Sequence, residues 1–236
     1  MIPLRDDAPR FGTPYVTYFL IAINLLVFIF EVMLPDAPRA MFVFDFGFVP
    51  ARTTAYLLGS HSIGAEAAFL PVLTSMFLHG SWLHVLGNMW FLHIFGDNVE
   101  DHLGHIRYLI TYLLAGLAAS FTHTLFNPGS DIPSVGASGA IAGVMGAYFI
   151  LYPGARVLTL VPFFFVYFVW LPAWVMLGYW FIVQFLSGAA TAIAVTSQSG
   201  RGGGGVAFWA HVGGFVAGIV LIKLFPSRPR RYQYYS

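Results

Sequence analysis

Long apolar blocks with few charges between them are the feature that most restricts how this chain can fold. Hydrophobic residues make up 58% of its 236 residues and charged residues only 9%. A bilayer core takes about 20 apolar residues per helix, and suitable blocks occur near 15–34, 83–100, 107–126, 138–152, 170–190 and 206–225. We therefore expect an all-α polytopic membrane protein built as a bundle of six transmembrane helices.

The six blocks divide the chain into three predicted parts. Residues 15–226 form a six-helix membrane domain, residues 1–14 a short N-terminal tail and residues 227–236 a short C-terminal tail. These tails leave no room for a soluble domain, so we expect the function to lie in or beside the membrane. The first block is too long for the apolar region of a signal peptide, and we expect it to be retained.

The nearly uncharged stretch 157–196 can hold one span, or two short spans broken near Leu171 and Pro172. With six spans and an inner N-terminus, eight Lys and Arg residues lie inside and three outside, whereas seven spans give five and six. Positive charge is enriched on the cytoplasmic side, which favours six spans and two cytoplasmic termini. Residues 157–169 are then an interfacial or tilted lead-in, or a part of the fifth helix.

The segment from Pro35 to Gly80 is a long first loop, rich in Phe. Aromatic residues suit the headgroup boundary, so one interpretation is a membrane-associated loop on the outer face, and a simple connector is an equal alternative. Glu31 lies near the outer end of the first block and Glu100 near the inner end of the second. We expect both carboxylates to be interfacial.

Polar residues recur in the second, fourth and sixth blocks. His84 and Asn88 stand four apart and share one helix face, Ser138 opens the fourth block, and His211 lies near the start of the sixth. These three helices run in the same direction, so the four side chains lie in the same outer half of the membrane. Intramembrane polar groups are costly, which makes them candidates for function.

The fourth block is too short to reach both membrane surfaces. Residues 138–152 make a helix of about 22 Å at 1.5 Å per residue, against a hydrocarbon core of about 30 Å. The preceding residues 127–137 are rich in Gly, Pro and Ser. Non-helical backbone at membrane depth needs protein or water around it, so we expect a wet pocket over Ser138.

Small residues mark one face of the fourth helix and one face of the sixth. The predicted packing glycines are Gly143, Gly146, Gly214 and Gly218, on the arcs that also carry Ser138 and His211. Such faces allow close approach of two helix backbones. Their packing would bring Ser138 and His211 together.

A serine beside a histidine is the minimal activated nucleophile. We predict Ser138 as nucleophile and His211 as general base, forming a dyad because no intramembrane Asp is placed to orient the histidine. The oxyanion donors would include the Ser138 backbone N–H, which is free at the start of a helix. The other predicted oxyanion and substrate-binding residues are Asn88, His84, Gly136 and Gly139.

Three motifs resemble those of the rhomboid intramembrane serine proteases. Gly136-Ala137-Ser138-Gly139 matches the family's Gly-x-Ser-Gly, His84 to Asn88 its His-x3-Asn, and Ala210 to Gly218 its helix with the catalytic histidine. The resemblance covers roughly residues 46–225. It implies six helices and cleavage of transmembrane protein substrates near the outer face of the lipid bilayer, without metal or cofactor and without a nucleic-acid partner.

Two departures from the family pattern affect how His211 is held and how the first loop docks. Many relatives carry an aromatic residue four positions after the serine, where this chain has Ala142. Either aromatics such as Phe208 or Trp209 hold His211, or it is held less firmly. The Trp-Arg pair that some relatives carry in the first loop is also missing. We interpret the other histidines as mainly peripheral; they are His61, His79, His93, His102, His105 and His123. Support of the pocket near His84 by His79 is the less favoured alternative.

Two other classes of function remain as alternatives. One is a non-catalytic binder of unstable transmembrane helices, although such relatives usually lack the serine or the base. The other is a metal or proton transporter using His84, His93 and His211, but His93 lies about 180° from His84 around its helix. The short tails and compact bundle indicate a bacterial plasma membrane, with an organelle membrane as the alternative.

Overall fold

The computed structural model describes residues 1–60, 62–163, 165–197 and 207–225. A helix covers each of the six predicted blocks. These helices are α1 (Tyr15–Met33), α5 (Trp82–Leu103), α6 (His105–Phe126), α7 (Ser138–Leu151), α8 (Ala173–Ser197) and α9 (Phe208–Leu224). The predicted C-terminal tail, 227–236, lies outside the described residues.

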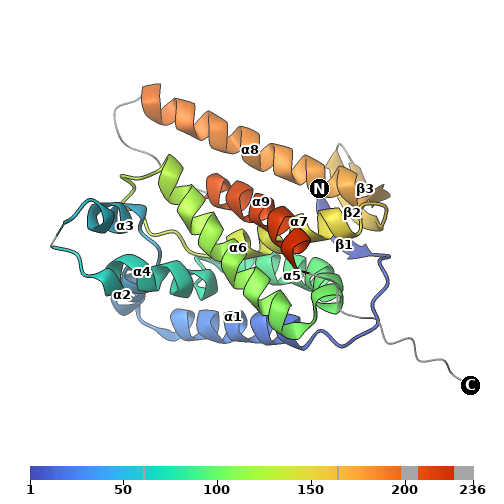
Figure 1. Ribbon diagram of the computed structural model, residues 1–236, viewed down its shortest axis with the longest axis horizontal. Helices are drawn as coiled ribbons and strands as arrows, with labels where there is room; N and C mark the ends of the chain where they lie inside the picture. The colour runs from blue at the N-terminus through green and yellow to red at the C-terminus, as the bar shows by residue number, and fades with distance from the viewer. Residues whose placement is uncertain (61, 164, 198–206, 226–236) are drawn as a thin grey trace, which may run out of the picture.

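The shortest of the six helices, α7, is the centre of the bundle. Its residues from Gly139 to Tyr148 are all buried, and it packs against α5, α6, α8 and α9. Helices α1 and α8 run along opposite edges of the bundle in Figure 1. A helix made largely of Gly, Ala and other small residues fits this position because four neighbours must approach it closely.

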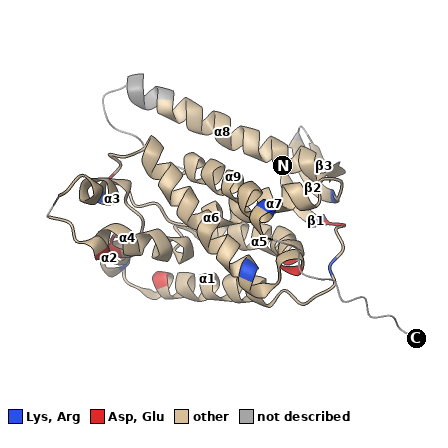
Figure 2. Cartoon of the chain, viewed as in Figure 1, with Lys and Arg blue, Asp and Glu red and all other residues tan. Residues whose placement is uncertain are grey.

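Three of the described helices are long and apolar enough to cross a membrane: α1, α6 and residues 173–192 of α8. A fourth span is possible if α4 (Ala65–Thr74) with the 3-10 turn Ser75–Phe77 and the following α5, bent by 76°, count as one. Helices α7 and α9 are apolar but shorter. Figure 2 shows charged residues at only a few places, mainly near helix ends. The chain is a multi-pass membrane protein, and six spans stay a prediction.

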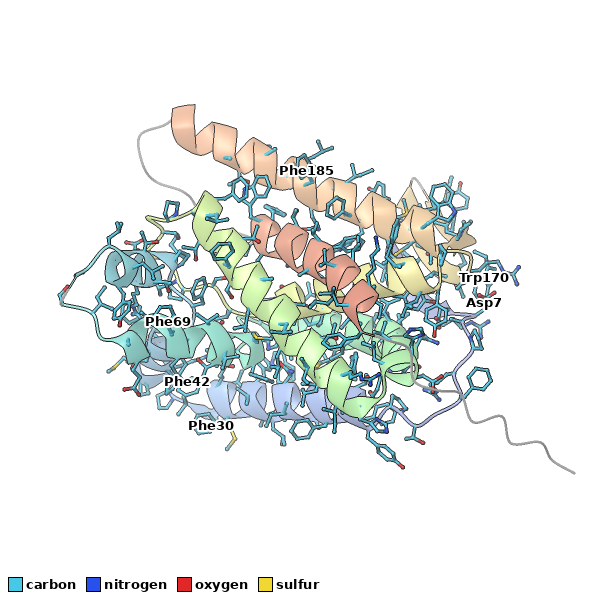
Figure 3. All side chains as sticks on the ribbon, viewed as in Figure 1. Asp7, Phe30, Phe42, Phe69, Trp170 and Phe185 are labelled. Atoms are coloured by element: carbon cyan, nitrogen blue, oxygen red, sulfur yellow. The ribbon has the colours of Figure 1, made fainter. Side chains whose placement is uncertain are left out.

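The first loop folds into short helices at one end of the bundle. They are α2 (Asp36–Phe46), α3 (Pro50–Leu57) and α4. The ring of Phe42 in α2 packs edge-on against Phe30 in α1, with 5.5 Å between centroids, and both rings are labelled in Figure 3. Thr53 Oγ1 donates to the Ala68 carbonyl at 2.8 Å, which ties α3 to α4.

The interpretation of 157–169 as a tilted lead-in or a part of the fifth helix is wrong, and so is a pair of spans broken near Leu171, whereas an interfacial position of this stretch stays a prediction. Strands β2 (Arg156–Phe163) and β3 (Phe165–Pro172) form an antiparallel hairpin. Strand β1 (Ile2–Asp6), within the predicted N-terminal tail, pairs with β2 to complete a three-stranded sheet. The stretch is rich in Val, Phe, Tyr and Trp, which favour strands. Its hydropathy alone, however, does not distinguish a strand from a helix.

This sheet lies at the end of the bundle opposite the first-loop helices (Figure 1). Asp7, directly after β1, accepts from the Arg156 Nε at 2.9 Å, and the Arg156 guanidinium lies over the Trp170 ring at 5.9 Å. Asp7 and Trp170 are neighbours in Figure 3. The start of the chain and the connection from α7 to α8 therefore lie at one end of the bundle.

Glu31 and Glu100 both have buried side chains, with 0% and 1% of their surface exposed, and their interfacial position along the membrane stays a prediction. The Glu100 carboxylate accepts from the backbone N–H groups of Val16 and Thr17, each at 2.8 Å, and from Thr17 Oγ1 at 2.7 Å. It also lies 2.6 Å from Nδ1 of His105. One carboxylate thus caps the start of α1 and joins α1, α5 and α6.

Candidate active site

Ser138 and His211 meet at the start of their helices. Ser138 is the first residue of α7, His211 lies in the first turn of α9, and the distance from Ser138 Oγ to His211 Nε2 is 2.7 Å. His211 is 8% exposed, and Ser138 is half-buried. This is hydrogen-bond distance for a hydroxyl that donates to an imidazole nitrogen.

Backbone contact between α7 and α9 sets that distance. A Cβ atom at Gly214 would lie 2.0 Å from the Gly139 carbonyl oxygen, and one at Gly218 would lie 1.8 Å from that of Gly143. At Gly146 a Cβ would lie 2.1 Å from the Phe215 carbonyl oxygen. Real Cβ atoms do not approach backbone this closely, so only glycine permits the observed separation of the helices.

Gly139 lines the cavity over Ser138 and also packs against α6, where a Cβ atom built on it would lie 2.6 Å from Cβ of Ala119. Its missing side chain thus makes room for a helix, and its role toward a substrate stays a prediction. Ala142 lies in the same seam, with its Cβ 3.4 Å from a Cβ built on Gly214. A larger residue at position 142 would push α9 away, which accounts for the absence of an aromatic there.

Gln184 and Trp180 of α8, neither of them identified from the sequence, hold the His211 ring. The distance from Gln184 Oε1 to His211 Nδ1 is 2.8 Å, and the Trp180 ring lies 5.6 Å from the imidazole. An amide oxygen only accepts, so Nδ1 carries the proton and Nε2 is free to accept from Ser138. The sequence did contain a signal for Gln184, which is an amide in an otherwise apolar stretch. Because it follows Trp180 by four residues, both side chains lie on the same face of the helix.

The aromatics expected to hold His211 lie elsewhere. Trp209 stacks on Phe126 of α6, with 3.7 Å between centroids and 7° between planes. Phe208 lines the cavity described below. Trp209 precedes His211 by only two residues, so the two side chains point to different sides of α9.

His84, Asn88 and Gly136 lie together in the wall of the cavity that Ser138 also lines. A Cβ atom at Gly136 would lie 2.8 Å from His84 Nε2 and 3.5 Å from Asn88 Nδ2. Gly136 has φ +130°, a conformation that other residues rarely adopt. Its N–H donates to the Ser75 carbonyl at 2.9 Å, so the first loop positions the first residue of the serine motif.

His79 belongs to the same group, against the expectation that it is peripheral. Its Nε2 lies 3.0 Å from Asn88 Nδ2, and its ring packs edge-on against His84 at 5.1 Å. Its side chain is fully buried. His79 lies in the connection before α5, outside any helix. Helical spacing therefore could not place it on the face of His84 and Asn88.

A cavity of about 1150 Å³ opens over Ser138. Its wall combines the polar groups of the site with the irregular segment that precedes α7. The lining includes Ser138, His211, His84, Asn88, Ser120, His123 and residues 126–136. The described residues contain no group of three or more His, Asp or Glu side chains placed to hold a metal ion. The Ser138 hydroxyl thus borders an open cavity.

Comparisons with known proteins agree with the motifs. The Rhomboid domain family model matches residues 66–228. RHOMBOID-like protein 6, mitochondrial, from Arabidopsis thaliana is 31% identical over 157 residues, covering 57% of this chain and 50% of the relative. RHOMBOID-like protein 1 from the same plant is 26% identical, covering 94% of this chain and 56% of the relative. Rhomboid protease GluP from Bacillus subtilis is 32% identical, covering 58% of this chain and 24% of the relative. The chain thus spans about half the length of these plant relatives.

Proposed function

The chain belongs to the rhomboid family, and from this premise we propose that it is an intramembrane serine endopeptidase. Ser138 is the nucleophile and His211 the general base. The observation that carries the proposal is the 2.7 Å contact between Ser138 Oγ and His211 Nε2 at the floor of the cavity. The name of the Bacillus subtilis relative, a rhomboid protease, supports the same reaction.

In the proposed reaction, His211 Nε2 takes the proton of Ser138 as the hydroxyl attacks a peptide carbonyl carbon. The imidazolium then gives this proton to the leaving amine, and water hydrolyses the acyl-enzyme with His211 again as base. The Gln184 amide oxygen accepts from Nδ1 throughout, so it holds the ring and favours the protonated imidazole.

The oxyanion of the tetrahedral intermediate would be bound by Asn88, His84 and the backbone N–H of Ser138. Both side chains lie beside Gly136, at the edge of the cavity next to the nucleophile. Donors fixed before the reaction stabilise developing charge without reorganisation. Gly136 itself allows the substrate carbonyl to approach these donors.

The proposed substrates are transmembrane segments of other proteins. A peptide bond must leave its helix before a serine can attack it, so segments with Gly, Pro or Ser should be cut faster than uniformly Leu-rich ones. The cavity offers polar side chains to the backbone groups that such unwinding exposes. In lipid alone these groups would stay unsatisfied.

The proposed topology has six spans, with both termini on the inner side and Ser138 in the outer half of the membrane. The position of β1 beside β2 agrees with it, because it puts residues 2–6 and 156–163 at one end of the bundle. Two relatives carry the words mitochondrial and chloroplastic in their names. The expected bacterial plasma membrane is not supported by these names, and we propose only an integral membrane location.

Fluorophosphonate labelling of the detergent-purified protein, with mass spectrometry of the adduct, tests the proposal. We expect one adduct, on Ser138, that is lost in Ser138→Ala and His211→Ala. Ser120→Ala is the matched control, because Ser120 lines the same cavity. An intact, folded protein that gives no adduct and cleaves no transmembrane substrate would instead favour the non-catalytic binder of unstable helices.

A further inference from the structure

Glu31 is a buried carboxyl group that the proposed reaction does not use. It is the one acidic residue of α1, and 0% of its surface is exposed. Burial of a carboxyl group in an apolar bundle costs free energy unless hydrogen bonds compensate. The buried Glu31 carboxyl group therefore needs a hydrogen-bond donor, and this donor is a residue of the active site.

That partner is His79. The backbone N–H of His79 donates to Glu31 Oε1 at 3.2 Å. Phe28, one turn before Glu31, packs edge-on against the His79 ring, with 6.4 Å between centroids and 87° between planes. Helix α1 therefore holds both the backbone and the ring of His79, in the connection that leads into α5.

His79 in turn holds the Asn88 amide. Asn88 Nδ2 lies 3.0 Å from His79 Nε2, and because an amide nitrogen only donates, Nε2 is the acceptor. An Asn side chain has two N–H bonds in one rigid plane. Once one of them is directed at His79, the direction of the other is determined as well.

The second N–H is the one available to an oxyanion. Asn88 borders the cavity, and its Nδ2 lies 3.5 Å from a Cβ atom built on Gly136. The His84 ring, the other side-chain donor, packs against His79 at 5.1 Å. Both proposed side-chain donors thus rest on His79, and His79 rests on Glu31.

We propose that Glu31 is a positioning residue of the active site: by accepting from the His79 backbone, it keeps His79 where it directs the Asn88 amide at the oxyanion. The inference rests on the proposed function. Small displacements of a donor cost much of its effect, because its stabilisation depends on geometry in the transition state. Loss of the Glu31 acceptor should therefore lower kcat and leave KM nearly unchanged.

The test compares cleavage of a transmembrane substrate in detergent by the wild type and two variants. Glu31→Met removes the acceptor and keeps an unbranched side chain, and we expect kcat to fall about 10- to 100-fold with KM within about twofold. Glu31→Gln keeps a carbonyl oxygen and should restore kcat to within about threefold. Asn24→Leu, also in α1 and fully buried but bonded to Leu20, is the matched control and should leave kcat unchanged.

A double-mutant cycle separates positioning from general destabilisation. In an Asn88→Ala background, Glu31→Met should cause a much smaller further loss of kcat, because the amide through which it mainly acts is gone and only the His84 ring still rests on His79. His79→Phe keeps a ring against Phe28 but loses the acceptor, so it should reproduce the loss and decides the case if Glu31→Met does not fold. Additive losses, or unchanged kcat in a folded variant, would overturn the inference. A wild type without Ser138-dependent cleavage would overturn the proposed function itself.

Discussion

Gly214 of α9 faces the backbone of α7 so closely that a Cβ atom on it would lie 2.0 Å from the carbonyl oxygen of Gly139. One turn later, Gly218 has the same relationship to Gly143. This seam brings Ser138 and His211 within hydrogen-bond distance, so the stability of the bundle and the geometry of the site depend on the same glycines.

Gly214→Ala should separate α7 from α9. Overpacking of this kind costs about 1–3 kcal/mol or more, so we expect a lower unfolding midpoint in detergent and loss of fluorophosphonate labelling. Gly87→Ala is the control, because Gly87 is in helix α5 with nothing within 4 Å of its Cβ position. Alanine there should be neutral or stabilise by up to about 1 kcal/mol. Equal unfolding midpoints for the two variants would contradict the seam.

Gln184→Leu should lower kcat about tenfold or more, because His211 loses the acceptor that holds Nδ1–H toward α8 and Nε2 toward Ser138. Substrate binding should change little. Steady-state cleavage of a transmembrane substrate measures both parameters. Val183→Ala is the matched control, since Val183 is 37% exposed on the same helix. If both variants cleave like the wild type, Gln184 has no part in catalysis.

Glu100→Ala should destabilise the bundle strongly. The carboxylate receives three hydrogen bonds from the first turn of α1 and contacts His105, and truncation leaves buried donors unpaired. Breaking a buried charged group of this kind costs about 3–5 kcal/mol. Denaturant or SDS unfolding of the purified protein reports the loss. Asp45→Ala, at an exposed position of α2, should change stability by no more than about 0.5 kcal/mol.

Asp6, outside the membrane-spanning helices, should make stability depend on pH. Burial raises its pKa from the ordinary 3.8 to about 6, although the Tyr148 hydroxyl that donates to it acts in the opposite direction. The folded protein therefore binds this proton more tightly than the unfolded chain. The resulting stabilisation is complete below about pH 4 and is lost as pH rises through about 6.

Unfolding midpoints measured between pH 4 and 8 check this sign. The wild type should lose stability across that range relative to Asp6→Asn, which keeps an acceptor for Tyr148 but does not titrate. Asp7, its neighbour, has a pKa lowered by the backbone N–H of Arg156 and then by its guanidinium. Asp7→Asn should therefore remove a small stabilisation that is present above about pH 4. A steeper loss in Asp6→Asn than in the wild type would refute the prediction.

Much of the fold could be predicted because hydropathy is a property of consecutive residues. All six apolar blocks are helices, and their ends lie within about four residues of the expected ones, apart from the later end of α8. The contact of Ser138 with His211 was also accessible, because helical spacing puts Gly214, Gly218 and His211 on one arc. The hairpin 156–172 could not be predicted, because an apolar run has the same hydropathy whether it forms a strand or a helix.

The sequence by itself determined which segments form the apolar helices, which faces carry small residues, and which residue types could perform acyl transfer. Only the tertiary structure decided which polar groups hold the proposed catalytic side chains: Gln184 contacts His211, and Glu31 bonds to His79, which contacts Asn88. In a chain whose helices are apolar on nearly every side, the partner of a buried polar group is set by which helices pack together. That choice depends on contacts between residues 27 and 48 positions apart, which periodicity along one helix does not contain.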